Sequence, residues 1–386
     1  MAACNVNGVT IHTAFRLNFA TPHDSLFNPL TKEEKMKTAS RIKNAKYVFI
    51  DEISMVSSIL LARIDHTLQQ TREVCEPFGG LSVIAFGDLY QLSPVCDPPV
   101  YEALPTKMMK SWTAASPANK IPSWSLFHMI ELEKNYRNEH WKQLEVLKFF
   151  RWGIWRIDDE SYLRELCAFT FETEKDAFDQ LDELQTKNPH KTFLILAAKN
   201  DTVNRLNRYK LNQLGGVLEI APVINRNGGN KSDEAEEKAT KLQLAVGCRV
   251  MITRNMNFST GIINGTIGVF LGIEKNMLMM KTGKYGMIAV PRVGYVDNGV
   301  RWNQFPIVAA EAITVHKAQG LTVDGVVVIC NSFWNKCGGM LYTAISRARN
   351  LALCRISGLN EKHWDTPDQA ATCLEEMARR NKILRF

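Results

Sequence analysis

The chain has 386 residues, of which 45% are hydrophobic, and this length can bury a sizeable core in two or three domains. Its 47 lysines and arginines against 40 aspartates and glutamates give a net charge of +7, which permits a polyanionic partner. The nine cysteines include no CxxC pair, which argues against a zinc site or a disulfide framework, and no long apolar run occurs. We therefore expect a protein that is not secreted and has no membrane partner.

Short apolar strands alternate with helical patterns along most of the chain. In chain order, strands are predicted at 47–50, 81–86, 192–197, 307–314 and 326–329, and helices at 57–73, 201–214 and 340–349. Such alternation indicates an α/β fold built on a parallel sheet. Between residues 247 and 291 the pattern changes to short alternating strands, with Asn264 and Gly265 as a hairpin turn signal. This segment predicts a small β-barrel inserted in the α/β fold.

The segment YVFIDEISM places Asp51 and Glu52 directly after an apolar strand. Ligands of open α/β sheets gather at the carboxyl ends of the strands. A nucleotide hydrolase needs one carboxylate there for the shell of a magnesium ion and another to orient or deprotonate the attacking water. The alternative is that this acidic pair only caps the following helix.

The segment GDLYQLSPV follows the next predicted strand, so that Asp88 and Gln91 are expected at the same sheet edge. The amide of Gln91 could donate to a terminal phosphate or hold the attacking water. The alternative is an ordinary loop residue at a strand exit between Gly87 and Pro94.

Three cations are candidates to neutralise the charge that develops on a transferred phosphoryl group. They are Arg137 in ELEKNYRN, Lys317 in VHKAQGLT and Arg347 in LYTAISRARN. Helix-borne arginines are more often solvated or salt-bridged, and Arg347 has a rival in Arg349.

Seven motifs occur in one order along the chain, namely GVTIHTAF, YVFIDEISM, GDLYQLSPV, ELEKNYRN, GCRVMITRN with INGTIG, AITVHKAQGLT and LYTAISRARN. Together they resemble the motifs of the Pif family of DNA helicases, in the Pif/RecD-like branch of superfamily 1B, from motif Ia to motif VI. The resemblance spans Gly8 to Asn350. It implies an ATP-dependent helicase that moves 5′ to 3′ on single-stranded DNA and unwinds duplex. It also implies two RecA-like parallel-sheet domains, with a small β-barrel inserted in the second.

The resemblance assigns a role to individual motif residues, with ATP and Mg²⁺ as cofactors. Asp51 would hold the magnesium ion through water, and Glu52 would be the catalytic base. The other residues implied in catalysis are Gln91, Arg137 and Arg347. Residues implied in ATP coupling are Asp88, Gln319 and Gly320, and those implied in DNA binding are Thr10, His12, His316, Lys317 and Thr322. For the two histidines, the alternative is a satisfied polar residue beside a strand.

The resemblance also implies domain boundaries and partners. Residues 1–133 would form an incomplete first RecA-like domain, residues 134–215 and 305–386 the second, and residues 216–304 the inserted subdomain. We expect a monomer that binds single-stranded DNA and DNA junctions and serves DNA repair, recombination or telomere maintenance. Its place would be the nucleus of a eukaryote, with mitochondria as a further site, or the cytoplasm otherwise.

The family carries a phosphate-binding loop of the form GxxxxGK[ST] ahead of its first motif, and no segment of the 386 residues matches it. That loop supplies amide groups and a lysine for the phosphates and a hydroxyl for magnesium. We therefore expect the chain to be a truncated form of such a helicase. The alternative is a module that has lost hydrolysis and binds single-stranded DNA or a partner protein.

Overall fold

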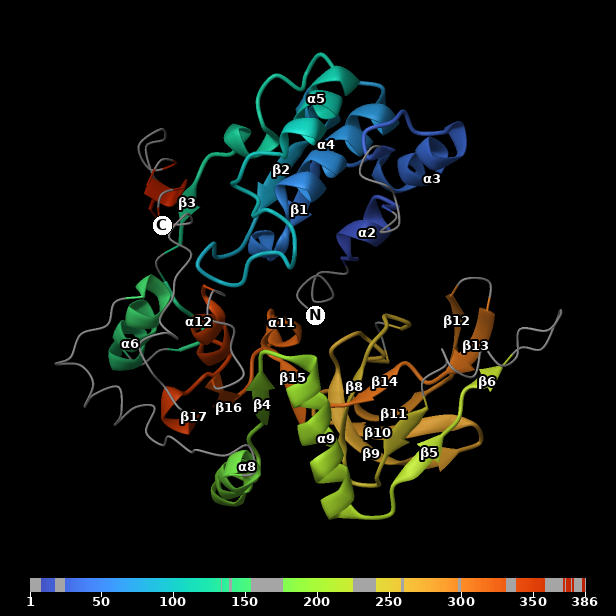
Figure 1. The fold of residues 1–386 in the computed structure, drawn as a ribbon, viewed down its shortest axis with the longest axis vertical. Helices are drawn as coiled ribbons and strands as arrows, with labels where there is room; N and C mark the ends of the chain where they lie inside the picture. The colour runs from blue at the N-terminus through green and yellow to red at the C-terminus, as the bar shows by residue number, and fades with distance from the viewer. Residues whose placement is uncertain are drawn as a thin grey trace.

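The structure is a computed structural model that forms two lobes joined by residues 134–138 (Figure 1). The described residues are 8–17, 25–132, 134–138, 141–153, 176–224, 241–257, 260–297, 300–330, 338–357, 371, 373–375, 377 and 384–385. The first lobe comprises residues 8–132 and the described residues from 371 onward, and the second lobe comprises residues 141–357. Within the described part of the chain, no helix is long and apolar enough to cross a membrane.

The first lobe is built on two parallel strands, β1 (Tyr47–Ile50) and β2 (Ser82–Ala85). Its helices are α2 (Ile11–Ala14), α3 (Lys32–Ile42), α4 (Ser58–Arg72) and α5 (Thr106–Ala115). The apolar side of α4 packs with β1, and Ile64 and Leu68 are completely buried in this core. The other face of the sheet is open, since Phe49 and Phe86 stack at 6.2 Å but are 65% and 45% exposed. The two apolar segments that form β1 and β2 are therefore buried on one face of the sheet only.

The second lobe contains a four-stranded sheet in which every pair is parallel. Its order is β15 (Ala312–Thr314), β4 (Phe193–Ala197), β16 (Gly325–Ile329) and β17 (Arg355–Ser357). The helices around it are α6 (Trp141–Trp152), α8 (Asp176–Lys187), α9 (Asn200–Leu214), α11 (Val315–Ala318) and α12 (Met340–Ile345). Every residue of β4 and β16 is buried, as expected for strands covered by helices on both faces. The predicted α/β class with parallel sheets is confirmed.

An antiparallel region lies beside this sheet (Figure 1). Five strands follow the order β11 (Gly286–Val290), β10 (Met277–Thr282), β9 (Ile267–Glu274), β8 (Arg249–Ile252) and β14 (Ile307–Ala309). Smaller sheets pair β12 (Val293–Asp297), β13 (Val300–Gln304) and β6 (Val223–Ile224), and β5 (Leu218–Ile220) with β7 (Leu242–Leu244). Among the strands described, no pairing joins β11 to β14, so the five form an open sheet. The predicted antiparallel insertion is present, but closure into a barrel is not confirmed.

The C-terminal residues return to the first lobe. Strand β18 (Leu384–Arg385) pairs in parallel with β3 (Ile130–Glu131), and the indole nitrogen of Trp124 donates to Cys373 Sγ at 3.4 Å. We expected these residues to belong to the second domain, and the domain boundaries themselves stay a prediction.

A buried carboxylate ties α4 to two short 3₁₀ helices, at Pro77–Gly80 and Ser123–Leu126. Asp65 is 2% exposed, and it accepts hydrogen bonds from Phe78 N at 2.6 Å, from Gln69 at 2.8 Å and from Ser123 at 2.9 Å. Burial raises the pKa of Asp65, while these three donors act in the opposite direction. The network therefore holds the side of the first lobe remote from the second.

Replacing Asp65 by alanine should destabilise the first lobe, because it leaves buried donors without an acceptor. We expect the free energy of unfolding to fall by about 3 kcal/mol. Asp182→Ala is the matched control, since the Asp182 side chain is 54% exposed in its ion pair with Lys210, and it should cost less than about 0.5 kcal/mol. Urea denaturation followed by tryptophan fluorescence measures both. Equal urea midpoints for the two variants would contradict the stabilising role of Asp65.

Candidate active site

Asp51 and Glu52 lie where β1 ends, beside the end of β2. The amide of Glu52 donates to Asp51 Oδ1 at 2.9 Å, and the amide of Ile53 donates to Phe86 O at 2.9 Å, which holds the two strand ends together. Glu52 has a φ of 54°, a left-handed conformation that is strained for a glutamate. Its side chain makes no capping hydrogen bond to the short helix that follows, and Ser57 caps α4 instead. The geometry therefore disfavours the capping alternative.

The second lobe reaches Glu52 through Gln319, which ends α11. The side-chain nitrogen Nε2 of Gln319 donates to Glu52 Oε2 at 2.9 Å and to Ser54 Oγ at 3.1 Å. Gly320 follows with a φ of 76°, which lets the chain turn away directly after this contact. Two predicted motifs from opposite lobes are thus joined by direct hydrogen bonds.

A second link between the lobes joins Arg347 to Gln91. Arg347 Nη2 donates to Gln91 Oε1 at 3.2 Å and to Ser346 Oγ at 2.9 Å, and its Nε donates to Thr343 O at 2.9 Å. Arg347 is 2% exposed, and burial together with the charge of Arg137 lowers its pKa to about 10, so it is still a cation at neutral pH.

Arg349, the other arginine of this motif, does not lie at the contact between the lobes. The side chain of Arg349 is 58% exposed and forms an ion pair with Asp324 at 3.4 Å. Of the two arginines of this motif, Arg347 is therefore the one that faces the first lobe.

Arg137 comes from the segment between the lobes and contacts the same motif. Its Nη1 donates to Ser346 O at 2.8 Å, and its Nε donates to Thr322 Oγ1 at 3.1 Å. These two hydrogen bonds anchor the guanidinium, although Arg137 as a whole is exposed. Partial burial lowers the pKa of Arg137, against the opposing effect of the Glu52 charge. Thr322, predicted to contact DNA, thus bonds to an arginine predicted to act on the nucleotide.

Asp88 also makes contacts across the lobes, with two partners that the sequence did not single out. Arg151 on α6 forms a salt bridge to it at 3.1 Å, and the hydroxyl of Tyr342 on α12 donates to Asp88 Oδ2 at 2.8 Å. Tyr342 belongs to the motif LYTAISRARN, which could have drawn attention to it. Arg151 carries no comparable signal in the sequence.

The residues predicted to bind DNA, apart from Thr322, lie on two short helices. Thr10 caps α2, whose residue His12 is half-buried, and Figure 1 shows α2 on the side of the first lobe nearest the second. On α11, Lys317 is exposed and His316 is half-buried. Burial lowers the pKa of His316, and burial with the charge of Arg63 lowers that of His12, so both imidazoles are neutral at neutral pH.

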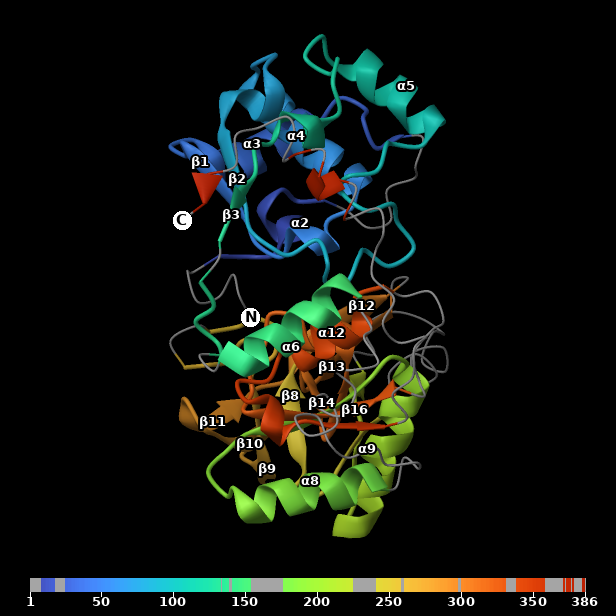
Figure 2. The same cartoon turned by 90° about the vertical axis from the view of Figure 1, so that its left-hand side faces the viewer.

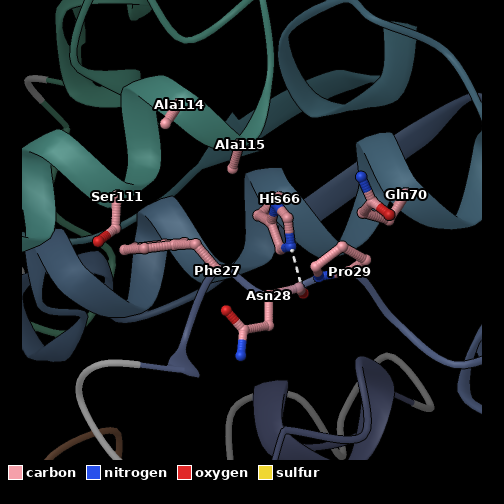
Figure 3. A pocket seen from close by; sticks show the side chains of 8 residues that line it. All are labelled: Phe27, Asn28, Pro29, His66, Gln70, Ser111, Ala114 and Ala115. Carbon is pink, nitrogen blue, oxygen red and sulfur yellow. Dashed lines mark hydrogen bonds between the residues drawn. The ribbon is translucent and has the colours of Figure 1, made fainter.

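A pocket of about 380 Å³ lies apart from these residues, between α4 and α5 (Figure 3). It is lined by Phe27, Asn28, Pro29, His66, Gln70, Ser111, Ala114 and Ala115. The ring nitrogen Nε2 of His66 lies 3.0 Å from Asn28 O, which fixes the ring at the pocket wall. The pocket contains no predicted site residue.

The assembled residues fit the hydrolytic end of a magnesium–nucleotide site. Asp51 is exposed at the sheet edge, and its carboxylate could hold a magnesium ion through water. Glu52 would face the attacking water, and Gln91, Arg137 and Arg347 would neutralise terminal phosphate oxygens. The individual roles remain predictions.

Three models of protein families match the chain. The PIF1-like helicase model matches residues 1–159, the DNA helicase Pif1 2B domain matches residues 238–272, and the UvrD-like helicase C-terminal domain matches residues 309–353. The first covers the first lobe, the second falls in the antiparallel insertion, and the third contains the motifs of Gln319 and Arg347.

Individual relatives agree with these matches. The chain is 27% identical to the ATP-dependent DNA helicase PIF1 of Danio rerio, over 92% of this chain and 53% of that protein. It is 27% identical to the ATP-dependent DNA helicase Pif1 of Bdellovibrio bacteriovorus, over 94% of this chain and 77% of that protein. The chain thus spans about half the length of the vertebrate relatives that it matches.

Solved structures give the same result. A Pif1 helicase from Bacteroides in complex with ADP-AlF3 and ssDNA is 27% identical, with a TM-score of 0.71 over 98% of this chain and 85% of that chain. A Pif1 helicase from Candida albicans, at 22% identity and a TM-score of 0.74, shares the fold.

The contact between the lobes should not tolerate a side chain at Gly339. This residue has a φ of 77° at the start of α12, and a Cβ there would overlap the carbonyl oxygen of Tyr90 in the first lobe. Gly216, with a φ of 59° and open space around it, is the control for a positive φ without an overlap. We expect Gly339→Ala to cost about 1–3 kcal/mol more than Gly216→Ala, and to increase the radius of gyration in small-angle X-ray scattering. An unchanged radius of gyration in both variants would mean that the lobes do not meet at this point in solution.

Proposed function

Because the chain belongs to the PIF1-like helicase family, we propose that it is the motor part of an ATP-dependent DNA helicase. The observation that carries this proposal is the pair of hydrogen bonds that cross between the lobes, from Gln319 to Glu52 and from Arg347 to Gln91. Arg137 donates to Ser346 O, next to Arg347. A site divided between two lobes can open and close as nucleotide binds and leaves, and this converts hydrolysis into movement.

The chemistry of the site follows from its side chains. Glu52 lies at the sheet edge and would take a proton from the attacking water, and the Asp51 carboxylate would hold the magnesium ion through water. Arg347 and Arg137 carry the positive charge that offsets the growing negative charge on the terminal phosphate. ATP with Mg²⁺ supplies the free energy.

The substrate in this proposal is single-stranded DNA, with translocation from 5′ to 3′ and unwinding of duplex at junctions. The positive net charge of +7 and the exposed Lys317 beside Gln319 support contact with a phosphate backbone. The protein would act as a monomer in DNA repair, recombination or telomere maintenance. It would work in the nucleus and mitochondria of a eukaryote, or in the cytoplasm of another cell.

A second candidate function is a hydrolysis-dead module that binds single-stranded DNA or a partner protein. It is favoured by the lack of a GxxxxGK[ST] segment in the 386 residues. The two candidates differ in ATP hydrolysis, and the DNA-binding form of the second shares its substrate with the first.

The chain should bind single-stranded DNA with an affinity that falls steeply with salt. Each neutralised phosphate contributes about −0.7 to the log-log slope, so roughly three to five contacts predict a loss of about ten-fold to a hundred-fold between 50 and 200 mM salt. Fluorescence anisotropy with a labelled oligonucleotide measures this loss. A folded sample that shows no binding at 50 mM salt would contradict the helicase and leave only a module that binds a partner protein.

Variants of α11 test the path of the DNA in the same assay. Lys317→Ala and His316→Ala should weaken binding, and loss of the Lys317 charge should reduce the salt slope by about 0.7. Lys187→Ala is the control, since Lys187 is an exposed lysine on α8, on the far side of the second lobe (Figure 1). If all three variants bind alike, α11 does not line the DNA path.

In any form of the protein that hydrolyses ATP, Arg347→Ala should lower kcat on the order of 10³-fold, because the guanidinium acts on charge that develops in the transition state. Glu52→Gln should abolish turnover and leave nucleotide binding intact. Arg349→Ala is the control and should stay within about two-fold of the parent, because Arg349 faces solvent beside Asp324. The opposite order of the two arginine variants in a steady-state assay would assign the catalytic role to Arg349.

A further inference from the structure

One charged cluster between the lobes has no part in the chemistry proposed above. At its centre is Asp88, whose two carboxylate oxygens are both occupied. Arg151 Nε lies 3.2 Å and 3.1 Å from Oδ1 and Oδ2, and Arg151 Nη2 lies 3.1 Å from Oδ1. Tyr342 donates to Oδ2 at 2.8 Å, and the amide of Tyr90 donates to Oδ1 at 3.2 Å. One first-lobe carboxylate thus receives donors from two helices of the second lobe.

The cluster is well shielded from water. The side chains of Arg151 and Asp88 are 26% and 17% exposed, and the Arg151 guanidinium lies 4.4 Å from the centre of the Tyr90 ring. A forked guanidinium–carboxylate pair fixes orientation as well as distance. Burial, with a further contribution from the Asp88 charge, raises the pKa of Tyr342, so its hydroxyl remains a donor throughout the neutral range.

The cluster is connected to the catalytic contacts by short pieces of backbone. In the first lobe, the amide of Gln91 donates to Asp88 O at 2.9 Å, so a tight turn links Asp88 to Gln91. In the second lobe, the amide of Ser346 donates to Tyr342 O at 2.9 Å, and Arg347 comes next. The helices that carry Arg151 and Tyr342, α6 and α12, lie together where the second lobe meets the first (Figure 1, Figure 2).

We propose that Arg151 and Tyr342 are positioning residues which hold Asp88 and thereby fix Gln91 within hydrogen-bond distance of Arg347. The importance of that distance rests on the proposed function, whereas the geometric claim does not. The partners of the Arg151 guanidinium in the first lobe are Asp88 and Tyr90, so it acts on Gln91 through the turn between Asp88 and Gln91.

Hydrogen–deuterium exchange on the full chain, without nucleotide or DNA, tests the geometric claim. Arg151→Met keeps the apolar stem and removes the fork, and it should speed exchange of the amides of residues 89–92 by about ten-fold, because a hydrogen bond to a charged group is lost. Tyr342→Phe should do the same to a smaller extent. Lys148→Met is the matched control, since the Lys148 side chain on the same helix is 49% exposed and forms an ion pair with Glu145 of α6 at 2.8 Å. It should leave residues 89–92 unchanged.

The NMR signal of the Arg347 Nε–H group reports the position of the catalytic arginine itself. It should shift in Arg151→Met and in Tyr342→Phe, remain in place in Lys148→Met, and return part of the way in Arg151→Lys, which restores the charge without the fork. A purely structural role of Arg151 in α6 would leave this signal unmoved.

Unchanged exchange at residues 89–92 together with an unshifted Arg347 signal would overturn the proposal. If Arg151→Met exchanges faster throughout β9 and β10, the variant is unfolded, and Tyr342→Phe, which removes one oxygen atom, decides alone. Loss of DNA binding or of ATP hydrolysis would count against the proposed function and not against this geometry.

Discussion

A cation buried at the boundary of the two lobes constrains the rest of the site. Arg347 is 2% exposed, and a buried charge without partners would cost several kcal/mol. Thr343 and Ser346 on its own helix accept two of its hydrogen bonds, and Gln91 of the first lobe accepts another. The charge of Glu52 opposes the pKa decrease that burial causes in Arg347. Arg347 can therefore stay both buried and charged only while the lobes are together, so closure of the lobes and assembly of the site are one event.

Apolar packing supports the same closure. Leu92 follows Gln91 in the first lobe, yet it is fully buried in the main core of the second lobe, beside Val146 of α6 and Ala344 of α12. Burying a leucine in this way is worth about 2 kcal/mol. Polar contacts at Gln91 and apolar contacts at Leu92 thus alternate along a single loop. The polar contacts orient the side chains, and burial of the apolar side chain contributes to the free energy that holds the lobes together.

The sequence predicted those parts of the site in which a local pattern carries the information. An apolar run that ends in Asp51 and Glu52 gave both the strand and the edge at which the carboxylates lie. The choice between Arg347 and Arg349 was beyond it, because α12 ends at Ile345 and both arginines lie in the turn after it. Only the packed structure shows which of the two side chains meets the other lobe. The partnership of Asp88 and Arg151 joins residues 63 positions apart in different lobes, and no periodicity encodes such a contact.

The difference between local patterns and long-range contacts also explains why the strands of the inserted subdomain were predicted while its closure into a barrel is not confirmed. Alternation of apolar and polar residues specifies strands with one buried face, and those strands are present as β8 to β11. Closure of a barrel depends on the stagger of the whole set of strands, which alternation along single strands does not encode. The open edge at β11 is therefore a feature that only the structure could supply.

The helix α11 provides a direct connection between the two predicted activities. His316 and Lys317, predicted to meet DNA, are separated by two or three positions from Gln319, which donates to Glu52. Because α11 has four residues and Gln319 directly follows it, we expect that a shift imposed on Lys317 by DNA would also move Gln319. Gln319 in turn holds one oxygen of the predicted catalytic base. By reciprocity, any change at Glu52 that alters this hydrogen bond must change the affinity for DNA by the same coupling free energy. In the proposed function, α11 and the glutamine that ends it would be the route by which DNA binding and ATP hydrolysis are coupled.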